Sequence, residues 1–120
     1  MAAAYHNLGV ALGKLGDLSG SVDAYRAAIA RDAQLPASHN NLAMLCAADE
    51  DALDDAAEHA EIAIRLRPDS ANYYDTLAWV RLRRGEFDRA EAAARLAMEL
   101  APDDAAFRDR LAQILAERAR

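Results

Sequence analysis

The chain has few of the residues that crosslink or activate a protein. Cys46 is its only cysteine, so no disulfide can form within the chain. Its neighbours Met44, Leu45 and Ala47 are apolar and none is basic, which indicates a small buried side chain rather than an activated thiol. A single cysteine is typical of a reducing compartment, and no leader-like segment follows Met1, so we expect a cytoplasmic protein.

Long apolar runs and an excess of positive charge are also missing. No stretch approaches the roughly 20 apolar residues that cross a bilayer, so we expect no membrane insertion. Twenty acidic and fourteen basic residues give a formal net charge of −6, which argues against a nucleic-acid partner, because phosphate binding requires clustered positive charge. Lys14 is the only lysine beside thirteen arginines, and with the abundant alanine this bias indicates a bacterial, GC-rich genome.

Aromatic residues make up only 6% of the chain, so we expect closely packed helices rather than a bulky core. Apolar residues recur at helical spacing, and no strand-like alternation occurs. Gly16, Gly85 and all three prolines fall at breaks in this pattern, where helices end or begin. The pattern predicts helices at residues 2–15, 18–32, 36–48, 52–66, 70–84, 87–100 and 104–118.

The chain repeats itself. A leucine followed by a small residue marks each unit, at Leu8-Gly9, Leu42-Ala43, Leu77-Ala78 and Leu111-Ala112. Successive pairs are about 34 residues apart, a period that is typical of a helical solenoid, in which each unit packs only on its neighbours. The interval between Leu42 and Leu77 is longer than the other two by a single residue. We assign this extra residue to the acidic turn 49–51, which lacks glycine, so Asp51 is expected to cap the next helix.

The spaced positions resemble the tetratricopeptide repeat, whose signature runs W-x2-L-G-x2-Y, A-x3-F and P. The third unit carries Tyr74, Leu77, Ala78, Gly85, Ala90, Ala97 and Pro102. The first carries Tyr5, Leu8, Gly9, Leu12, Gly16, Ser21, Tyr25 and Ala28, and the second His39, Leu42, Ala43, Cys46, Ala56, Ala60, Ala63 and Pro68. The resemblance implies an all-α, right-handed helical solenoid of seven antiparallel-paired helices. It forms one domain over residues 1–120, with repeats at about 2–35, 36–70 and 71–104 and a capping helix at 104–118.

Small side chains are needed where the two helices of one unit approach each other, and Gly9, Ala43 and Ala78 meet this need. Ala60 and Ala94 depart from the family pattern. They stand where the family usually has an aromatic residue, as Tyr25 does in the first unit. We therefore expect thinner packing around the second and third units.

In this family the first helix of each unit lines a concave groove. By that resemblance the groove contains His6, Asn7, Val10, Asn40, Asn41, Met44, Asn72, Asp75, Thr76 and Trp79, with Lys14 and Arg83 near its edges. Asn7 and Asn41 are one repeat period apart, and a row of amides matches the donors and acceptors of an extended peptide. Val10, Met44 and Trp79 form an apolar stripe, in which Trp79 is a candidate anchor for a partner.

These residues also have a structural reading, in which the asparagines bond local backbone groups and Trp79 packs on a neighbouring helix. Some members of the family grip a C-terminal carboxylate with a clamp of Lys, Arg and Asn. Asn41 fits that clamp, whereas His6, Asn72 and Thr76 stand at its other positions, so we do not expect it here. Asp75 instead favours a basic side chain in the ligand.

We expect no catalytic, metal or cofactor site. The histidines His6, His39 and His59 lack metal-ligand spacing, although His6 and His39 lie on adjacent predicted helices. His59 is expected on a solvated helix face. The acidic residues within 54–61 crowd one helix, and charge runs of this kind are typical of a solvated surface.

The sequence therefore predicts a non-catalytic protein–protein interaction module, which binds a peptide segment of a partner protein in its concave groove. The alternative is a structural segment of a larger protein that self-associates weakly through its open end, because no unit precedes the first helix. Residues 49–61 carry seven acids and residues 81–84 carry three arginines, so opposite turns of two copies would attract each other.

Overall fold

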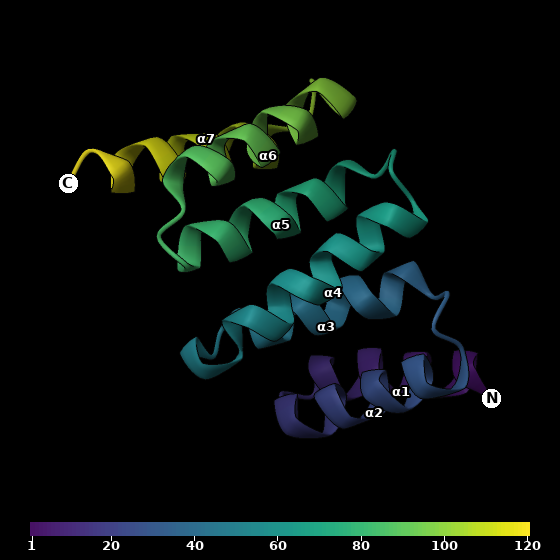
Figure 1. Cartoon of the computed structure of the whole chain (residues 1–120). Helices are drawn as coiled ribbons and strands as arrows, with labels where there is room; N and C mark the ends of the chain where they lie inside the picture. Colours follow the sequence, from purple (N-terminus) through teal and green to yellow (C-terminus); the bar gives the residue numbers. More distant parts are fainter.

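The computed structural model describes all 120 residues and contains seven α-helices and no strand (Figure 1). The helices are α1 (Ala2–Lys14), α2 (Leu18–Arg31), α3 (Pro36–Cys46), α4 (Leu53–Leu66), α5 (Ala71–Arg83), α6 (Phe87–Leu100) and α7 (Ala105–Arg118). The predicted all-α architecture is confirmed, and each predicted helix end lies within two residues of the observed one.

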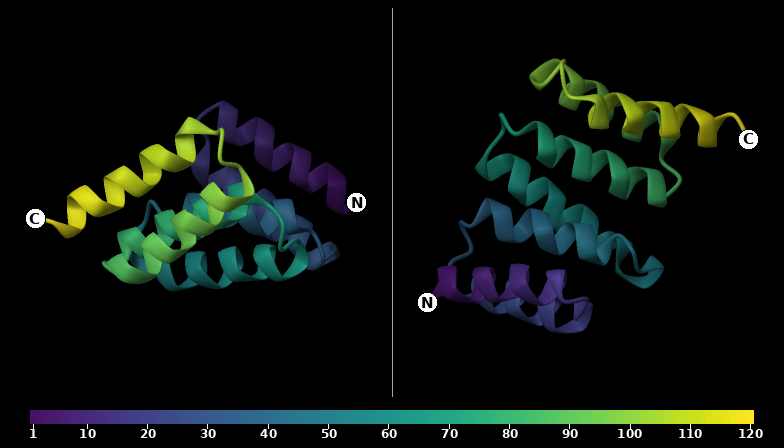
Figure 2. Two further views of the ribbon diagram at one scale, coloured as in Figure 1. Left: turned by 90° about the horizontal axis from the view of Figure 1, so that it is seen from above. Right: turned by 180° about the vertical axis from the view of Figure 1, so that it is seen from behind.

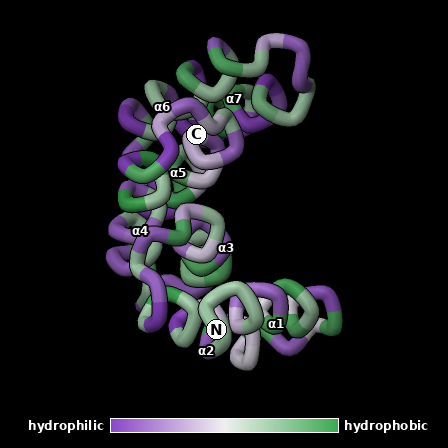
Figure 3. Tube along the Cα trace, turned by 90° about the vertical axis from the view of Figure 1, so that its right-hand side faces the viewer, coloured by the Kyte–Doolittle hydropathy of each residue, from purple (hydrophilic) through white to green (hydrophobic).

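The helices form successive antiparallel pairs, α1 with α2, α3 with α4 and α5 with α6, and α7 packs on α5 and α6. The pairs stack along the long axis of a body that measures 43 × 28 × 23 Å, with the two termini at opposite ends (Figure 1). The tube view shows that the stack curves. Helices α1, α3, α5 and α7 lie on the inner side and α2, α4 and α6 on the outer side (Figure 3). Seen from above, α1 and α7 lie on the same side of the other helices and diverge from each other (Figure 2).

Two glycines end helices as the sequence predicts. Gly16 and Gly85 have φ angles of +84° and +76°, which is the left-handed region that favours glycine because it has no Cβ. These positions turn the chain from α1 into α2 and from α5 into α6. Side-chain caps begin three helices: Asp17 accepts from the Gly20 N–H, Ser70 from the Tyr73 N–H and Asp104 from the Ala106 N–H.

The turn between α3 and α4 is built differently from the prediction, and the expected cap at Asp51 is wrong. Asp49 is the capping residue, because its side chain accepts a hydrogen bond from the Asp51 N–H at 3.0 Å. A short 3₁₀ turn, η1 (Glu50–Ala52), follows, and α4 begins at Leu53 without a side-chain cap. The extra residue of the second unit is therefore absorbed by a tighter turn before the helix starts.

The seam between α1 and α2 pairs a glycine with an aromatic ring. A Cβ built on Gly9 would lie 2.7 Å from Cε1 of Tyr25, so the buried ring occupies the space that a methyl group would need. Ser21 Oγ adds a hydrogen bond to the Gly9 carbonyl at 2.7 Å. The second and third units carry alanine at both corresponding positions, and Ala60 and Ala94 are buried. Small residues on both helices thus replace the pairing of glycine with tyrosine.

The repeated leucine fills the interface between units. Leu42, Leu77 and Leu111 are buried, and Leu42 is 0% exposed. Leu8 occupies the same repeat position in α1 but is 47% exposed, because in this structure no helix packs on that side of α1. The same repeat position is therefore buried in one unit and exposed in another, depending on whether a neighbouring helix pair packs on it.

Candidate functional site

The concave face is formed by the first helix of each unit together with α7 (Figure 3). Helix α3 lies near its centre and presents Asn40 and Met44 one helical turn apart. Met44 is 52% exposed, so a large apolar side chain faces solvent on this surface. Such a side chain is available for contact with a partner.

Asn40 is the unusual polar residue of the concave face. It is only 7% exposed, and its Nδ2 donates to Asn41 Oδ1 at 3.5 Å and lies 4.0 Å from Met44 Sδ. Its Oδ1 is buried and has no hydrogen-bond partner. An acceptor that is desolvated without a bond costs about 1–3 kcal/mol, and because this oxygen is buried, a ligand N–H would reach it only after the Asn40 amide turns toward the groove.

His6 and Asn41 link the first two units. His6 Nδ1 lies 2.8 Å from Ser38 Oγ, which joins α1 to α3, and its ring packs at 5.5 Å against the ring of Tyr25. Asn41 Nδ2 donates to the Tyr25 hydroxyl at 3.2 Å, which joins α3 to α2. The side chains of His6 and Asn41 therefore already have partners within the chain. Val10, also on α1, is half-buried against the hydrophobic core.

Two hollows open where α1 meets α3. The first, of about 230 Å³, lies at the start of α3 and is lined by His6, Asn7, Leu35, Pro36, Ser38 and Arg67. The second, of about 210 Å³, is lined by Gly13, Ser21, Tyr25, Asn41, Met44 and Leu45. Asn7 is exposed at the first hollow and Met44 at the second. Each hollow is large enough to receive a side chain of a partner.

Trp79 is half-buried, and two arginines of this chain already lie against its ring. The Arg110 guanidinium lies 4.9 Å from the centre of the indole ring and that of Arg83 lies 5.8 Å from it. Asp75 holds Arg110 through contacts of 3.1 and 3.4 Å, and Arg83 Nε donates to the Ala47 carbonyl at 3.1 Å. This chain of contacts joins α3, α5 and α7, and it occupies the carboxylate of Asp75.

Arg110 is the concave-face residue that the sequence analysis missed. It stands one repeat period after Thr76, at the position that Asn7 and Asn41 also occupy. Extending the repeat into the last helix would therefore have predicted Arg110 on this face. Thr76 itself is buried, and its hydroxyl donates to the Asn72 carbonyl at 3.1 Å. Asn72 is exposed nearby.

The acidic and basic turns meet within the chain. Arg84 lies 3.5 Å from Asp54 and 3.7 Å from Glu86, so the turn after α5 pairs with the start of α4. Asp54 is almost fully exposed, and surface pairs of this kind contribute about 0–1 kcal/mol. The attraction between opposite turns is therefore partly satisfied inside one copy.

The histidines do not occupy the places that the sequence suggested. The partner of His39 is His59 and not His6: the two rings stack at 5.2 Å, with their Nδ1 atoms 2.9 Å apart. His59 is half-buried rather than on a solvated face. His39 Nε2 lies 2.9 Å from the Ala33 carbonyl and must donate to it, so His39 Nδ1 accepts the proton of His59 Nδ1.

This pair makes stability depend on pH. Burial and the neighbouring His39 lower the pKa of His59, Arg26 acts in the same direction, and Glu58 and Asp55 partly oppose them. The unfolded chain binds a proton near the ordinary pKa of 6.5 while the folded chain resists it, so stability is full above that pH and is lost as the pH falls. We expect a slope of up to about 1.4 kcal/mol per pH unit from this group. Urea titrations between about pH 7.5 and pH 5.5 should show a smaller loss for His59→Gln than for the native chain. Equal losses would contradict this account.

Cys46 is buried, and burial is the main cause that raises the pKa of its thiol. A thiol with a raised pKa holds its proton at neutral pH and is a poor nucleophile. No group of three or more histidine, cysteine, aspartate or glutamate side chains converges as a metal site. None of the helices has the length and apolar character needed to span a bilayer.

Comparison with known proteins identifies the class to which this repeat and its concave face belong. The model of the tetratricopeptide repeat family matches residues 2–35 and 71–104, which is more than half of the chain. The chain belongs to the tetratricopeptide repeat family, as the leucine and glycine signature predicts. No curated protein matches the sequence closely enough to be counted as a relative.

Solved structures share the complete fold. The first TPR of Spaghetti (RPAP3), bound to the HSP90 peptide SRMEEVD, has 18% identity and a TM-score of 0.89, with 99% of this chain and 94% of that chain covered. The Sgt2 TPR domain from Aspergillus fumigatus has 20% identity and a TM-score of 0.87, with 98% and 79% covered. The second TPR domain of human RPAP3, in complex with the HSP70 peptide SGPTIEEVD, has 19% identity and a TM-score of 0.85, with 94% and 93% covered. At these identities the likeness shows the fold.

Proposed function

We propose that this protein is a non-catalytic interaction module, an adaptor that binds an extended segment of a partner protein across its concave face. The observation that carries the proposal is Met44, which is 52% exposed on the concave face, one turn from the buried Asn40 Oδ1 that has no donor. An apolar side chain of the ligand would pack on Met44, and a backbone N–H would satisfy Asn40 once its amide turns toward the groove. Asn7 would bond the ligand further along, at the hollow beside α1.

The likeness to two peptide complexes supports a peptide ligand, but this chain differs in how it would hold one. The peptides in those structures end in EEVD. At three positions of the family's clamp of Lys, Arg and Asn, this chain has no lysine or arginine: it has His6, bonded to Ser38, the exposed Asn72 and the buried Thr76. We therefore propose recognition of the main chain in the middle of a segment, without capture of a C-terminal carboxylate. The single cysteine and the arginine-rich composition support a cytoplasmic protein from a bacterium.

Peptides selected from a random display library on the native protein test this proposal. Met44→Glu places a charge on the concave face, and Leu96→Glu places one on the convex face, at side chains that are 52% and 43% exposed. Both variants should fold, because exposed substitutions usually change stability by about 0.5 kcal/mol or less. We expect a concave-face peptide to lose at least about tenfold in affinity, or about 1.4 kcal/mol, with Met44→Glu. The same peptide should bind Leu96→Glu unchanged.

A scan of N-methylated versions of the selected peptide examines main-chain recognition directly. Methylation removes the N–H donor, so the one amide that bonds Asn40 should weaken binding strongly while its neighbours have little effect. Peptides that bind Met44→Glu and Leu96→Glu both as tightly as the native chain would belong to neither face and would not support the concave site. A failure to select any peptide that depends on Met44 would contradict it.

One observation favours the structural alternative, a segment that associates through its open end. Leu8 is 47% exposed at a repeat position that is buried in the other units. Sedimentation velocity over a wide range of protein concentration distinguishes the two functions. A sedimentation coefficient that rises with concentration, and no longer does so in Leu8→Lys, would support self-association. A constant coefficient would remove this alternative.

A further inference from the structure

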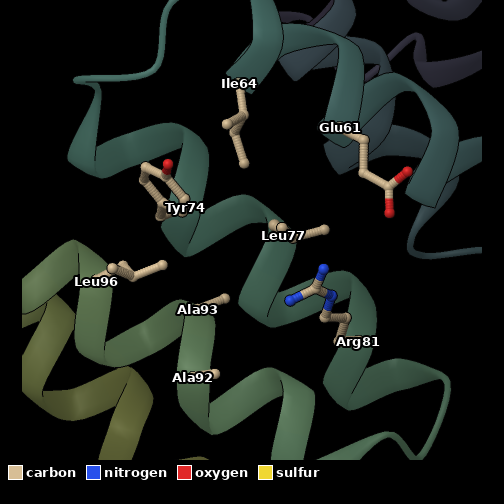
Figure 4. Close-up of a pocket in the computed structure, with 8 residues that line it drawn as sticks. All are labelled: Glu61, Ile64, Tyr74, Leu77, Arg81, Ala92, Ala93 and Leu96. Atoms are coloured by element: carbon tan, nitrogen blue, oxygen red, sulfur yellow. The ribbon is translucent and has the colours of Figure 1, made fainter.

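A hollow of about 290 Å³ opens on the convex face, between α4 and α6 and above α5 (Figure 4). Its apolar wall is formed by Ile64 of α4, Tyr74 and Leu77 of α5, and Ala93 and Leu96 of α6. Leu96 is 43% exposed, so an apolar side chain at the edge of the hollow faces solvent. This site is on the opposite side of the stack from the concave face.

The repeat itself shows why the hollow is open. One repeat period earlier in the sequence, His39 holds the position of Tyr74 and His59 holds the position of Ala93. There the ring of His59, on α4, stacks on that of His39, on α3, at 5.2 Å. In the later groove a methyl group stands in place of that ring. The hollow therefore has room for a ring side chain against its apolar wall.

An arginine without an ion pair lies at one end of this hollow. Figure 4 shows the guanidinium of Arg81 pointing between Leu77 and Ala93. Its Nη1 donates only to the Arg89 carbonyl, at 3.2 Å, and no carboxylate lies within 4.0 Å of it. The neighbouring Arg84 and Arg89 both pair with Glu86, at 3.7 and 3.5 Å.

The positive charge of Arg81 has little compensation from its surroundings. Burial, and then the nearby Arg89, lower its pKa, and Glu61 and Glu86 only partly oppose them. Glu61 also lines the hollow, but it is exposed and makes no ion pair. Cys46 holds the position of Arg81 one unit earlier, so this cation belongs to the later groove alone. A carboxylate that reached Arg81 would form a charge-assisted pair in a partly desolvated place.

We propose that this convex hollow is a second binding site, which receives an acidic segment of a partner protein. The segment inserts one large apolar side chain, aromatic or leucine, over Leu77 and Ala93, and it places an Asp or Glu carboxylate on Arg81. The apolar side chain takes the space that His59 fills in the earlier groove. The carboxylate supplies the partner that Arg81 lacks. This site is independent of the concave face, so either one can bind without the other.

Selection on the Met44→Glu variant isolates this site, because the concave face is then altered. We expect a random display library to yield peptides with one large apolar residue and an Asp or Glu within one helical turn of it. The affinity of such a peptide should be equal for the native chain and for Met44→Glu. It should fall at least about tenfold for Ala93→His, which copies the earlier groove, and for Leu96→Glu, whose exposed site tolerates the change.

A double-mutant cycle examines the carboxylate. Replacing the acid of the peptide by its amide should weaken binding to the native chain but not to Arg81→Gln, because the partner is then gone. Three results would overturn the proposal: selected peptides that are basic, binding that Ala93→His and Leu96→Glu both leave unchanged, or no selected peptides at all. Concentration-dependent association that Leu96→Glu abolishes would also overturn it, because a second copy of the chain would then occupy the hollow.

Discussion

Replacing Leu42 by alanine is expected to lower the free energy of unfolding by about 2–5 kcal/mol. Leu42 is 0% exposed and belongs to the main hydrophobic cluster, where the second unit packs between its neighbours. Removing the side chain loses its transfer free energy and leaves a cavity that rigid helices only partly close. Urea denaturation followed by circular dichroism measures the change.

Leu8→Ala is the matched control, because Leu8 holds the same repeat position. Its side chain is 47% exposed, so we expect a cost of about 1 kcal/mol or less. Equal costs for the two substitutions would contradict the stacking order described above. A large cost for Leu8→Ala that depends on protein concentration would instead show that a second copy covers α1 in solution.

The second large effect is expected at Tyr25. Tyr25→Ala should cost about 3–5 kcal/mol, because the buried ring fills the seam between α1 and α2. The substitution also removes the hydroxyl that accepts from Asn41. Thermal and urea unfolding of the variant measure this loss.

Gly9→Ala should partly rescue Tyr25→Ala. On its own, Gly9→Ala forces the ring away from a methyl group that would stand 2.7 Å from it, at about 1–3 kcal/mol, and gains about 1 kcal/mol of helix propensity. In the double variant the methyl group meets no ring, and the seam resembles the pairs of alanines in the later units. We expect the double variant to be more stable than the sum of the two changes predicts, by about 0.5–3 kcal/mol. Strict additivity would show that Gly9 and Tyr25 do not share this seam.

Local signals in the sequence were sufficient for the helices and their order. The period of the repeat, the glycines at positions 16 and 85 and the prolines between units act within a few residues, so they predict helix ends directly. The exception is instructive. Asp49 and Asp51 have the same side chain and lie in the same turn, so residue type does not distinguish them as caps. Asp49 is the cap because the chain forms a 3₁₀ turn directly after it.

The candidate site could be predicted only in outline. The family resemblance placed Asn40, Met44 and Trp79 on the inner helices, but it did not say which side chains were already engaged. Arg110 is far from Trp79 along the chain, and its stacking on the indole ring arises from how α7 packs on α5. Similarly, His59 of α4 contacts His39 of α3. The acidic residues around His59 in the sequence predicted a solvated helix face and gave no sign of this contact.

The sequence by itself determined the helices, their pairing into units and the repeat positions that must be small or apolar, because these depend on periodicity and on local backbone preferences. Only the tertiary structure decided the environment of equivalent positions. Leu8 and Leu42 differ in exposure because a neighbouring helix pair packs on Leu42 and none packs on Leu8 in this structure. The hollow lies where Ala93 stands at the repeat position of His59. Whether a side chain is buried, and which side chain it contacts, depends on residues that only the stacking of the helices brings together. A local sequence pattern does not predict those neighbours.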